Sequence, residues 1–326
     1  MEHGILKADR VTQSQDHATD GFHHEAFLYA GREEYLDGTA SFIREGLAAG
    51  EPALVVVDGP KIAWLRDELG ADGEDVQFAD MALVGSNPAR IIQAWRDFVD
   101  QRGDTGSRVR GIGEPISPDL SPAELVECQR HETLLNLVFG ETPAFRLMCP
   151  YDTDALDEWV VEEALRSHPV VASDGHRIPS SLYGGIELAT APFSVPLPEA
   201  PVEARELYFE APSLAALRQY VALRAADAEV EPTRIEDLLL AVNEVATNSL
   251  RHGAGAGYLR IWEEPDALVC EVRDEGVFDQ PLAGRLRPTP AQIGGYGLWV
   301  ANQVCDLVQV RSLPGGTAVR LRMRRR

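Results

Sequence analysis

The chain has 326 residues, of which 44% are apolar and 25% are charged, and its length favours two folded domains. No apolar run reaches the roughly 20 residues of a membrane helix, and the first 25 residues lack the pattern of a secretion signal, so we expect a cytoplasmic protein without membrane contact. Residues 1–202 carry 15 Lys and Arg against 35 Asp and Glu, a charge balance that excludes a nucleic-acid partner for this half.

We expect residues 1–21 to be a flexible N-terminus, and from residue 22 predicted strands and helices alternate. Short apolar runs predict strands at 24–30, 52–58, 76–81, 108–115 and 144–152. Helical periods, several ended by glycine or opened by serine or asparagine, predict helices at 33–50, 60–70, 87–103, 121–140 and 154–169. This alternation indicates an α/β domain over residues 22–185, with a mostly parallel sheet and helices on both faces.

A linker follows, because residues 186–204 are rich in proline and have neither a helical nor a strand period. Over 205–326 the pattern changes to a strand at 205–211, helices at 213–228 and 231–253, and then strands with one returning helix at 294–306. This order indicates an α/β sandwich of mixed topology.

The segment "NEVATNSLRHG" (243–253) places Glu244 and Asn248 on one stripe of the second helix, because residues four apart lie one above the other. A solvated polar stripe on an amphipathic helix is the simplest interpretation. A chemical interpretation competes with it, because an asparagine oxygen can bind Mg²⁺ and a carboxylate one turn earlier can act as a general base.

Two later segments favour the chemical interpretation. In "VRDEG" (272–276), Asp274 ends a strand and Gly276 follows, so the carboxylate can accept the amine of an adenine that approaches the backbone closely. In "GGYGLWVANQVCD" (294–306), a glycine-rich loop runs into a helix, and such a helix start attracts phosphate.

These motifs resemble the GHKL ATPase superfamily, most closely its anti-sigma factor kinases, over about residues 203–326. The resemblance implies a Bergerat-type α/β sandwich that uses ATP and Mg²⁺ as a serine/threonine protein kinase. It implies Glu244 as the catalytic base and Asn248 as the Mg²⁺ ligand. The implied nucleotide-binding residues are Asn248, Asp274, Gly276, Gly294, Gly295, Gly297 and Leu298.

The resemblance also implies partners: an anti-sigma factor antagonist of the STAS type, a sigma factor, or both, bound by a homodimer. Arg285 and Arg287, in the lid segment 279–293, are candidate phosphate contacts. The chain departs from the family where Phe278 replaces the second glycine of the first glycine box.

Two alternatives remain beside the kinase. The first is a nucleotide-gated module that captures a protein without phosphorylating it, which Phe278 motivates. The second is a sensor histidine kinase, but the linker carries no pair of dimerisation helices, and the candidate His24 falls on a predicted strand.

Residues 22–183 resemble the MEDS sensory family through "HHEAFLY", "EPALVVVD", "RGIGEP", "HETLLN" and "LMCPYD". The resemblance implies a RecA/KaiC-like sheet. No GxxxxGK[ST] loop follows the first strand, so we expect a sensor of an unidentified small molecule rather than a second ATPase.

Candidate sensory residues lie near the ends of predicted strands, where open α/β sheets bind ligands. They are His24, Tyr29, Glu114, Glu132, Cys149 and Tyr151. His24 with Cys149 could form a metal site or a thiol-reactive site. The competing interpretation is that His24 and Tyr151 are buried, hydrogen-bonded core residues.

Overall fold

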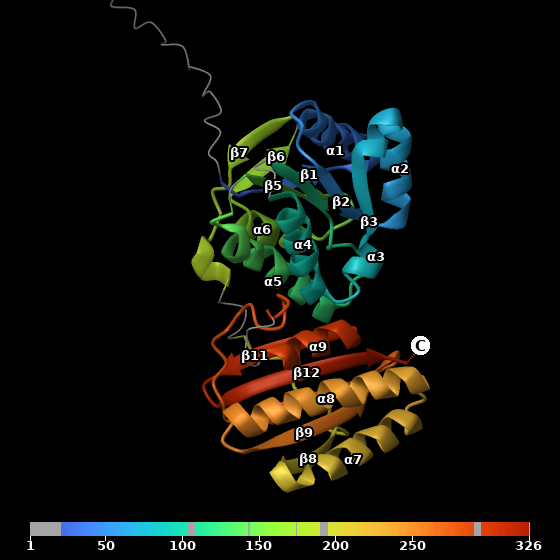
Figure 1. Cartoon of the computed structure of the whole chain (residues 1–326), viewed down its shortest axis with the longest axis vertical. Coiled ribbons are helices and arrows are strands. Elements are labelled where there is room, and N and C mark those ends of the chain that lie inside the picture. The colour runs from blue at the N-terminus through green and yellow to red at the C-terminus, as the bar shows by residue number, and fades with distance from the viewer. Residues whose placement is uncertain are drawn as a thin grey trace, which may run out of the picture.

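The computed structural model describes residues 21–103, 108–142, 144–173, 175–189, 195–289 and 295–325. Two sheets organise these residues, one in each half of the chain (Figure 1). Within the described residues, no helix has both the length and the apolar character needed to cross a membrane. The predicted fold class, an α/β sheet domain followed by an α/β sandwich, is confirmed.

The N-terminal sheet has the strand order β3-β2-β4-β5-β1-β6-β7. Its strands are β1 (His23–Tyr29), β2 (Ala53–Val57), β3 (Val76–Asp80), β4 (Val109–Gly113), β5 (Phe145–Asp152), β6 (Val170–Ser173) and β7 (His176–Pro179). Six strands pair in parallel and only β7 is antiparallel, on β6. The sequence patterns had predicted the first five strands but not β6 and β7.

Helices cover both faces of this sheet, and each face has its own hydrophobic core. They are α1 (Gly31–Ala48), α2 (Gly59–Leu69), α3 (Met81–Val84), α4 (Ile91–Gly103), α5 (Pro122–Phe139) and α6 (Glu158–Ser167), with 3-10 turns η1 (Gly70–Asp75) and η2 (Pro88–Arg90). α1 and α2 pack on one face, whereas α4, α5 and α6 pack on the other. Ser121 and Glu124 form a capping box that fixes the start of α5.

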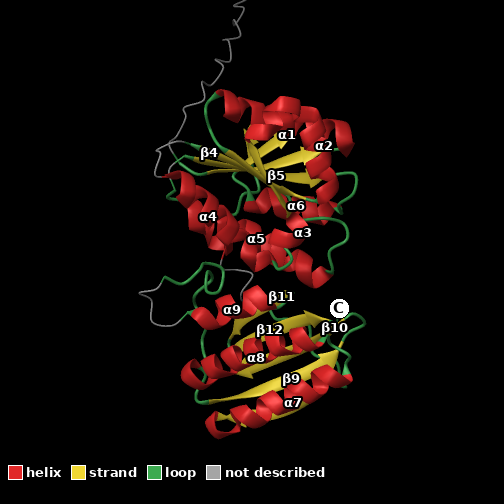
Figure 2. Ribbon diagram, turned by 45° about the vertical axis from the view of Figure 1, so that its right-hand side comes forward, coloured by secondary structure: helices red, strands yellow, loops and turns green. Residues whose placement is uncertain are grey.

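The C-terminal sheet has the order β11-β12-β10-β9-β8, and every pairing in it is antiparallel. The strands are β8 (Arg205–Glu210), β9 (Ala256–Glu263), β10 (Ala267–Asp274), β11 (Leu307–Leu313) and β12 (Gly316–Arg324). The helices are α7 (Leu214–Asp227), α8 (Pro232–His252) and α9 (Tyr296–Val304), with the turn η5 (Ala211–Ser213). Another turn, η3 (Ile186–Ala189), precedes this domain and packs against α5. These three helices lie together on one face of the sheet (Figure 2).

The two domains meet where η2 faces the end of α9. The amide of the buried Asn87 donates to the carbonyl oxygens of Asn302 and Cys305, at 3.3 and 3.2 Å. The guanidinium of Arg90 donates to the carbonyl oxygens of Asn302, at 2.8 Å, and Gln303. The last carbonyls of a helix have no partner within it and carry a partial negative charge, so the N-terminal domain supplies both the donors and the cation that this helix end needs.

Candidate functional site

Glu244 and Asn248 lie one turn apart on α8, both half-buried, and face the first turn of α9. Gly297 shows how closely α9 approaches these two side chains of α8. A Cβ atom on Gly297 would lie 2.9 Å from Asn248 Nδ2 and 3.1 Å from Glu244 Oε2. The glycine therefore leaves room beside the two side chains, at the start of α9, where the first N–H groups of the helix have no acceptor within it.

Asp274, at the end of β10, is held beside the C-terminal end of α8. Its Oδ2 accepts a hydrogen bond from Ser249 Oγ at 2.5 Å, and its Oδ1 accepts one from the Gly276 N–H at 2.8 Å. A Cβ atom on Gly253 would lie 2.4 Å from Asp274 Cγ, so this glycine is also required for the approach. The sequence analysis missed Ser249, whose only signal is its place next to Asn248.

The remaining nucleotide-binding candidates differ in position. Gly276 packs under the end of α8, where a Cβ atom would lie 2.6 Å from the His252 carbonyl oxygen. Gly295 precedes α9 with φ 86°, in the left-handed region that glycine favours. The side chain of Leu298 points into the hydrophobic core of the C-terminal domain, and Gly294 lies outside the described residues.

Phe278, which departs from the family pattern, packs against the hydrophobic core of the C-terminal domain. Its backbone N–H donates to Ser312 Oγ at 3.0 Å. The ring therefore has a packing role in this domain.

The two candidate phosphate-binding arginines contact the N-terminal domain instead. Arg285 is buried and its Nη2 lies 3.3 Å from Glu127 Oε2. Arg287 pairs with Asp97 at 3.4 Å, and its N–H donates to Gln93 Oε1 at 2.6 Å. Both arginines are oriented by α4 and α5.

Leucines of the same segment strengthen this docking. Leu282 and Leu286 pack against the N-terminal core that lies under α4, α5 and α6. We call residues 279–289 the lid. Through its leucines and arginines, the lid is attached to the other domain rather than lying free over the C-terminal site.

Glu127 is the centre of the buried charges between the domains. Its carboxylate accepts from Arg130 Nη1 at 2.8 Å and from Arg311 Nη2 at 2.9 Å, in addition to Arg285. Burial alone would raise the pKa of Glu127, but Arg130, Arg311 and Arg285 outweigh that effect, so the pKa is lowered and the carboxylate stays ionised. We call Glu127 with these three arginines the Glu127 hub.

The structure divides the candidate sensory residues into two groups. The first group lies at the carboxyl ends of β1 and β4, where Tyr29 Oη donates to Glu114 Oε1 at 2.8 Å. Lys61 Nζ, which the sequence analysis missed, lies 2.6 Å from the same oxygen. Burial raises the pKa of Glu114 to about 7, and this effect exceeds the opposing effect of Lys61.

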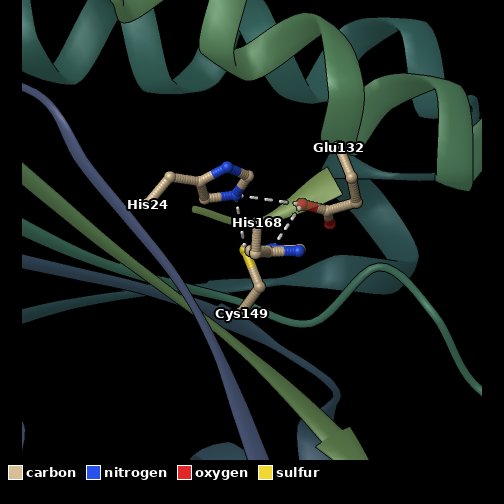
Figure 3. A group of neighbouring side chains, drawn as sticks. All are labelled: His24, Glu132, Cys149 and His168. Atoms are coloured by element: carbon tan, nitrogen blue, oxygen red, sulfur yellow. Dashed lines mark hydrogen bonds and ion pairs between the residues drawn. The ribbon is translucent and has the colours of Figure 1, made fainter. Parts of the chain in front are cut away.

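The second group lies deeper, on the face covered by α5 and α6, and combines His24 and Cys149 with Glu132 and His168 (Figure 3). The four side chains point toward one another. His24 Nε2 lies 3.2 Å from Glu132 Oε2 and 3.4 Å from Cys149 Sγ, and His168 Nε2 lies 3.4 Å from Glu132 Oε2. All four are buried, each with at most 2% of its surface exposed.

Burial shapes the protonation of this second group. It lowers the pKa of His24 to about 4 and raises that of the Cys149 thiol. Tyr151, also buried, stands edge-on to His168 with ring centroids 5.6 Å apart.

The sequence analysis missed His168, because it falls in the turn after α6 rather than on a predicted strand end. The arrangement joins His24 and Cys149, as the metal-site hypothesis required. It also buries His24 and Tyr151, as the core interpretation required.

Comparison with known families identifies both halves of the chain. Residues 23–169 match the model of the MEthanogen/methylotroph, DcmR Sensory domain, MEDS. Residues 209–323 match the model of the histidine kinase-like ATPase domain. No curated protein matches the chain. The predicted fusion, a MEDS domain followed by an ATPase domain, is confirmed.

Proposed function

We propose that this chain, in which a MEDS sensory domain precedes a histidine kinase-like ATPase domain, is an ATP- and Mg²⁺-dependent serine/threonine protein kinase of the anti-sigma factor type. The observation that carries the proposal is the assembly of Glu244 and Asn248 against Gly297, at the start of α9. A solvated polar stripe would not need a glycine facing it at this distance.

The residues present fit an Mg²⁺-nucleotide. The Asn248 side-chain oxygen is a hard ligand of the kind that Mg²⁺ prefers, and a Cβ atom on Gly297 would fill the space beside it. Asn248 would hold the Mg²⁺, whose positive charge would offset the negative charge of the phosphate oxygens. The N–H groups at the start of α9 would bind phosphate, and Asp274 would accept the exocyclic amine of the adenine.

In this proposal Glu244 is the general base of the reaction. It would accept the proton of a serine or threonine hydroxyl as that oxygen bonds to the γ-phosphorus. The bond from that phosphorus to the bridging oxygen would break, and ADP would leave. The products are a phosphorylated side chain, ADP and one proton on Glu244.

The partners are part of the same proposal. An anti-sigma factor antagonist of the STAS type would be the phosphate acceptor, and a sigma factor would be the protein sequestered by a homodimer of the chain. The switch between these partners would control transcription. A small molecule would be sensed by the MEDS domain.

The contact of the lid with the MEDS domain supports regulation of the kinase by the sensor. Leu282 and Leu286 pack on the MEDS core, and Arg285 is held by Glu127. Because a lid that contacts the sensor shares its conformational equilibrium, a signal that alters the MEDS domain would alter access to the nucleotide site.

A sensor histidine kinase is less well supported. His24 is buried in β1, where a phosphoryl donor has no access. Between β7 and β8, the described residues contain one 3-10 turn, η3, and no pair of long helices.

Calorimetry on the full chain, with and without Mg²⁺, tests the nucleotide site. We expect ATP to bind more tightly with Mg²⁺, and Asn248→Ala to abolish this difference. Asn243→Ala is the matched control, because Asn243 lies on the same helix but pairs with Arg218 at the surface. If the parent chain binds no ATP, the kinase proposal fails, and the alternative of a module that captures a protein without phosphorylating it is favoured.

Phosphotransfer to a STAS-type antagonist tests the reaction itself. We expect Glu244→Gln to keep ATP binding and lose phosphotransfer, because it keeps the shape of the side chain and removes the base. Phosphotransfer at the parent rate in this variant would refute the role of Glu244. An acid-labile phosphate on the chain itself would instead indicate a histidine kinase.

A further inference from the structure

The cluster of His24, Glu132, Cys149 and His168 is independent of the nucleotide site, and four different segments supply it. His24 lies on β1, Glu132 on α5 and Cys149 on β5, whereas His168 ends α6. One ligand atom from each residue lies within 4.8 Å of the other three. The protein thus concentrates four metal-binding side chains in the interior of the MEDS domain.

Hydrogen bonds outside the cluster fix how the two histidines face it. His168 Nδ1 lies 2.8 Å from the Ala164 carbonyl oxygen, which can only accept, so Nδ1 carries the proton. His24 Nδ1 lies 3.1 Å from Asn136 Oδ1, and the amide nitrogen of Asn136 is occupied in donating to the Ser167 carbonyl oxygen at 2.7 Å. Both histidines therefore turn an Nε2 lone pair toward the cluster.

The cluster consequently contains more acceptors than donors. Two Nε2 lone pairs and the Glu132 carboxylate converge, and the Cys149 thiol is the single proton that these groups can share. His168 Nε2 and Glu132 Oε1 are buried without a hydrogen-bond partner. Buried acceptors without donors are costly, and one bound metal cation would satisfy all of them together.

The distances are compatible with a zinc-class cation. Zinc-class ions bind nitrogen, oxygen and sulfur at about 2.0–2.3 Å, so the ligand atoms of a tetrahedral site lie about 3.3–3.8 Å apart. Three of the six separations between the ligand atoms are 3.2, 3.4 and 3.4 Å, and all six lie within 4.8 Å. Two imidazoles, one thiolate and one carboxylate suit a borderline ion such as Zn²⁺ or Co²⁺ better than Mg²⁺ or Ca²⁺.

We propose that the MEDS domain binds one zinc-class divalent cation through His24 Nε2, His168 Nε2, Cys149 Sγ and a Glu132 carboxylate oxygen. Asn136 and the Ala164 carbonyl are the outer partners that orient the two imidazoles. The four side chains complete a tetrahedral set.

Cobalt is the probe that tests the proposal in the untagged full chain after metal removal. We expect one Co²⁺ per chain, with visible bands of tetrahedral intensity and a near-ultraviolet band from charge transfer between thiolate and cobalt. Cys149→Ser should lose the near-ultraviolet band. Cys128→Ser is the matched control, because this thiol is equally buried but bonds the Pro115 carbonyl oxygen instead.

The outer partner gives a second test. Asn136→Ala should weaken Co²⁺ binding by about 10–100-fold, which is typical when the residue orienting a histidine ligand is removed. A parent chain that takes up no Co²⁺, or one whose band persists in Cys149→Ser, would overturn the proposal.

A third measurement uses the parent chain alone and applies even where a variant does not fold. Addition of Zn²⁺ should raise the thermal unfolding midpoint of the metal-free chain, and a chelator should reverse the rise. An unfolding midpoint that neither Zn²⁺ nor the chelator changes would overturn the proposal.

Discussion

Replacing Glu127 by glutamine tests whether the Glu127 hub holds the two domains together. The substitution keeps the shape of the side chain and removes the charge that balances three guanidinium groups. Glu127, Arg285 and Arg311 have side chains only 2%, 6% and 4% exposed, so water cannot replace the lost charge. Removing one partner of such a buried pair destabilises by about 3–5 kcal/mol, and we expect a loss of this size in the free energy of unfolding.

Glu124→Gln provides the comparison, because Glu124 lies one turn earlier on α5 and also pairs across the domains, with Arg324 at 2.6 Å. The side chain of Arg324 is 47% exposed, so this pair should contribute about 0–1 kcal/mol. Glutamine also keeps the capping box of α5.

Urea unfolding followed by tryptophan fluorescence measures both losses. Hydrogen exchange then shows which segments of the chain lose stability. In Glu127→Gln, backbone amides of the lid and α9 should exchange faster, and the ATPase domain should unfold at lower urea than the MEDS domain. If Glu127→Gln loses no more stability than Glu124→Gln, the hub does not join the domains and the reasoning fails.

Two further substitutions give distinct readouts. Gly297→Ala should weaken ATP binding at least tenfold in calorimetry, because the added Cβ atom would lie 2.9 Å from Asn248 Nδ2 and 3.1 Å from Glu244 Oε2. Gly315→Ala is the control: a Cβ atom there has no neighbour within 4 Å, so this variant should bind ATP as the parent does. Glu114→Gln should remove a pH dependence of the free energy of unfolding. The Glu114 carboxyl has a pKa of about 7 in the folded protein against 4.5 for an ordinary glutamate, so the folded state binds its proton more tightly. The stability that this proton contributes, about 3 kcal/mol, is therefore lost as the pH rises between these two values. Urea unfolding at pH 5 and pH 8 measures the difference between variant and parent, and an equal difference at both pH values would contradict it.

Most elements of the fold could be predicted because their patterns are local. The run of β-branched residues at 52–58 could only be a buried strand, and Ser121 with Pro122 marked the start of α5. β6 and β7 were missed because they are four residues each, and β7 is wholly exposed and ends in proline, so no apolar alternation marks it. Strand direction in the C-terminal sheet could not be predicted, because it depends on the loops, such as the turn at Gly315 and Gly316, rather than on the strands.

The same distinction separates the two candidate sites. Glu244 and Asn248 could be paired from sequence because their spacing on one helix determines that they are neighbours. The lid arginines were assigned to phosphate because no pattern near Arg285 indicates Glu127, which lies 158 residues earlier. His168 was missed for a similar reason: its approach to His24 depends on the pairing of β1 with β5 and β6 and on the position of α6.

The cap that Asn87 and Arg90 provide for the end of α9 has a consequence for evolution and for the construction of chimeras. The last turn of α9 is completed by residues from another domain, more than 200 positions away in the chain. An ATPase domain transplanted onto a different sensor would inherit a helix end with unbonded carbonyls. Asn87 Nδ2 also donates to the Asn302 side-chain oxygen Oδ1, at 3.2 Å. Across chains that share this pairing of domains, we therefore expect position 87 and position 302 to change together, so that the two domains are inherited as a matched pair.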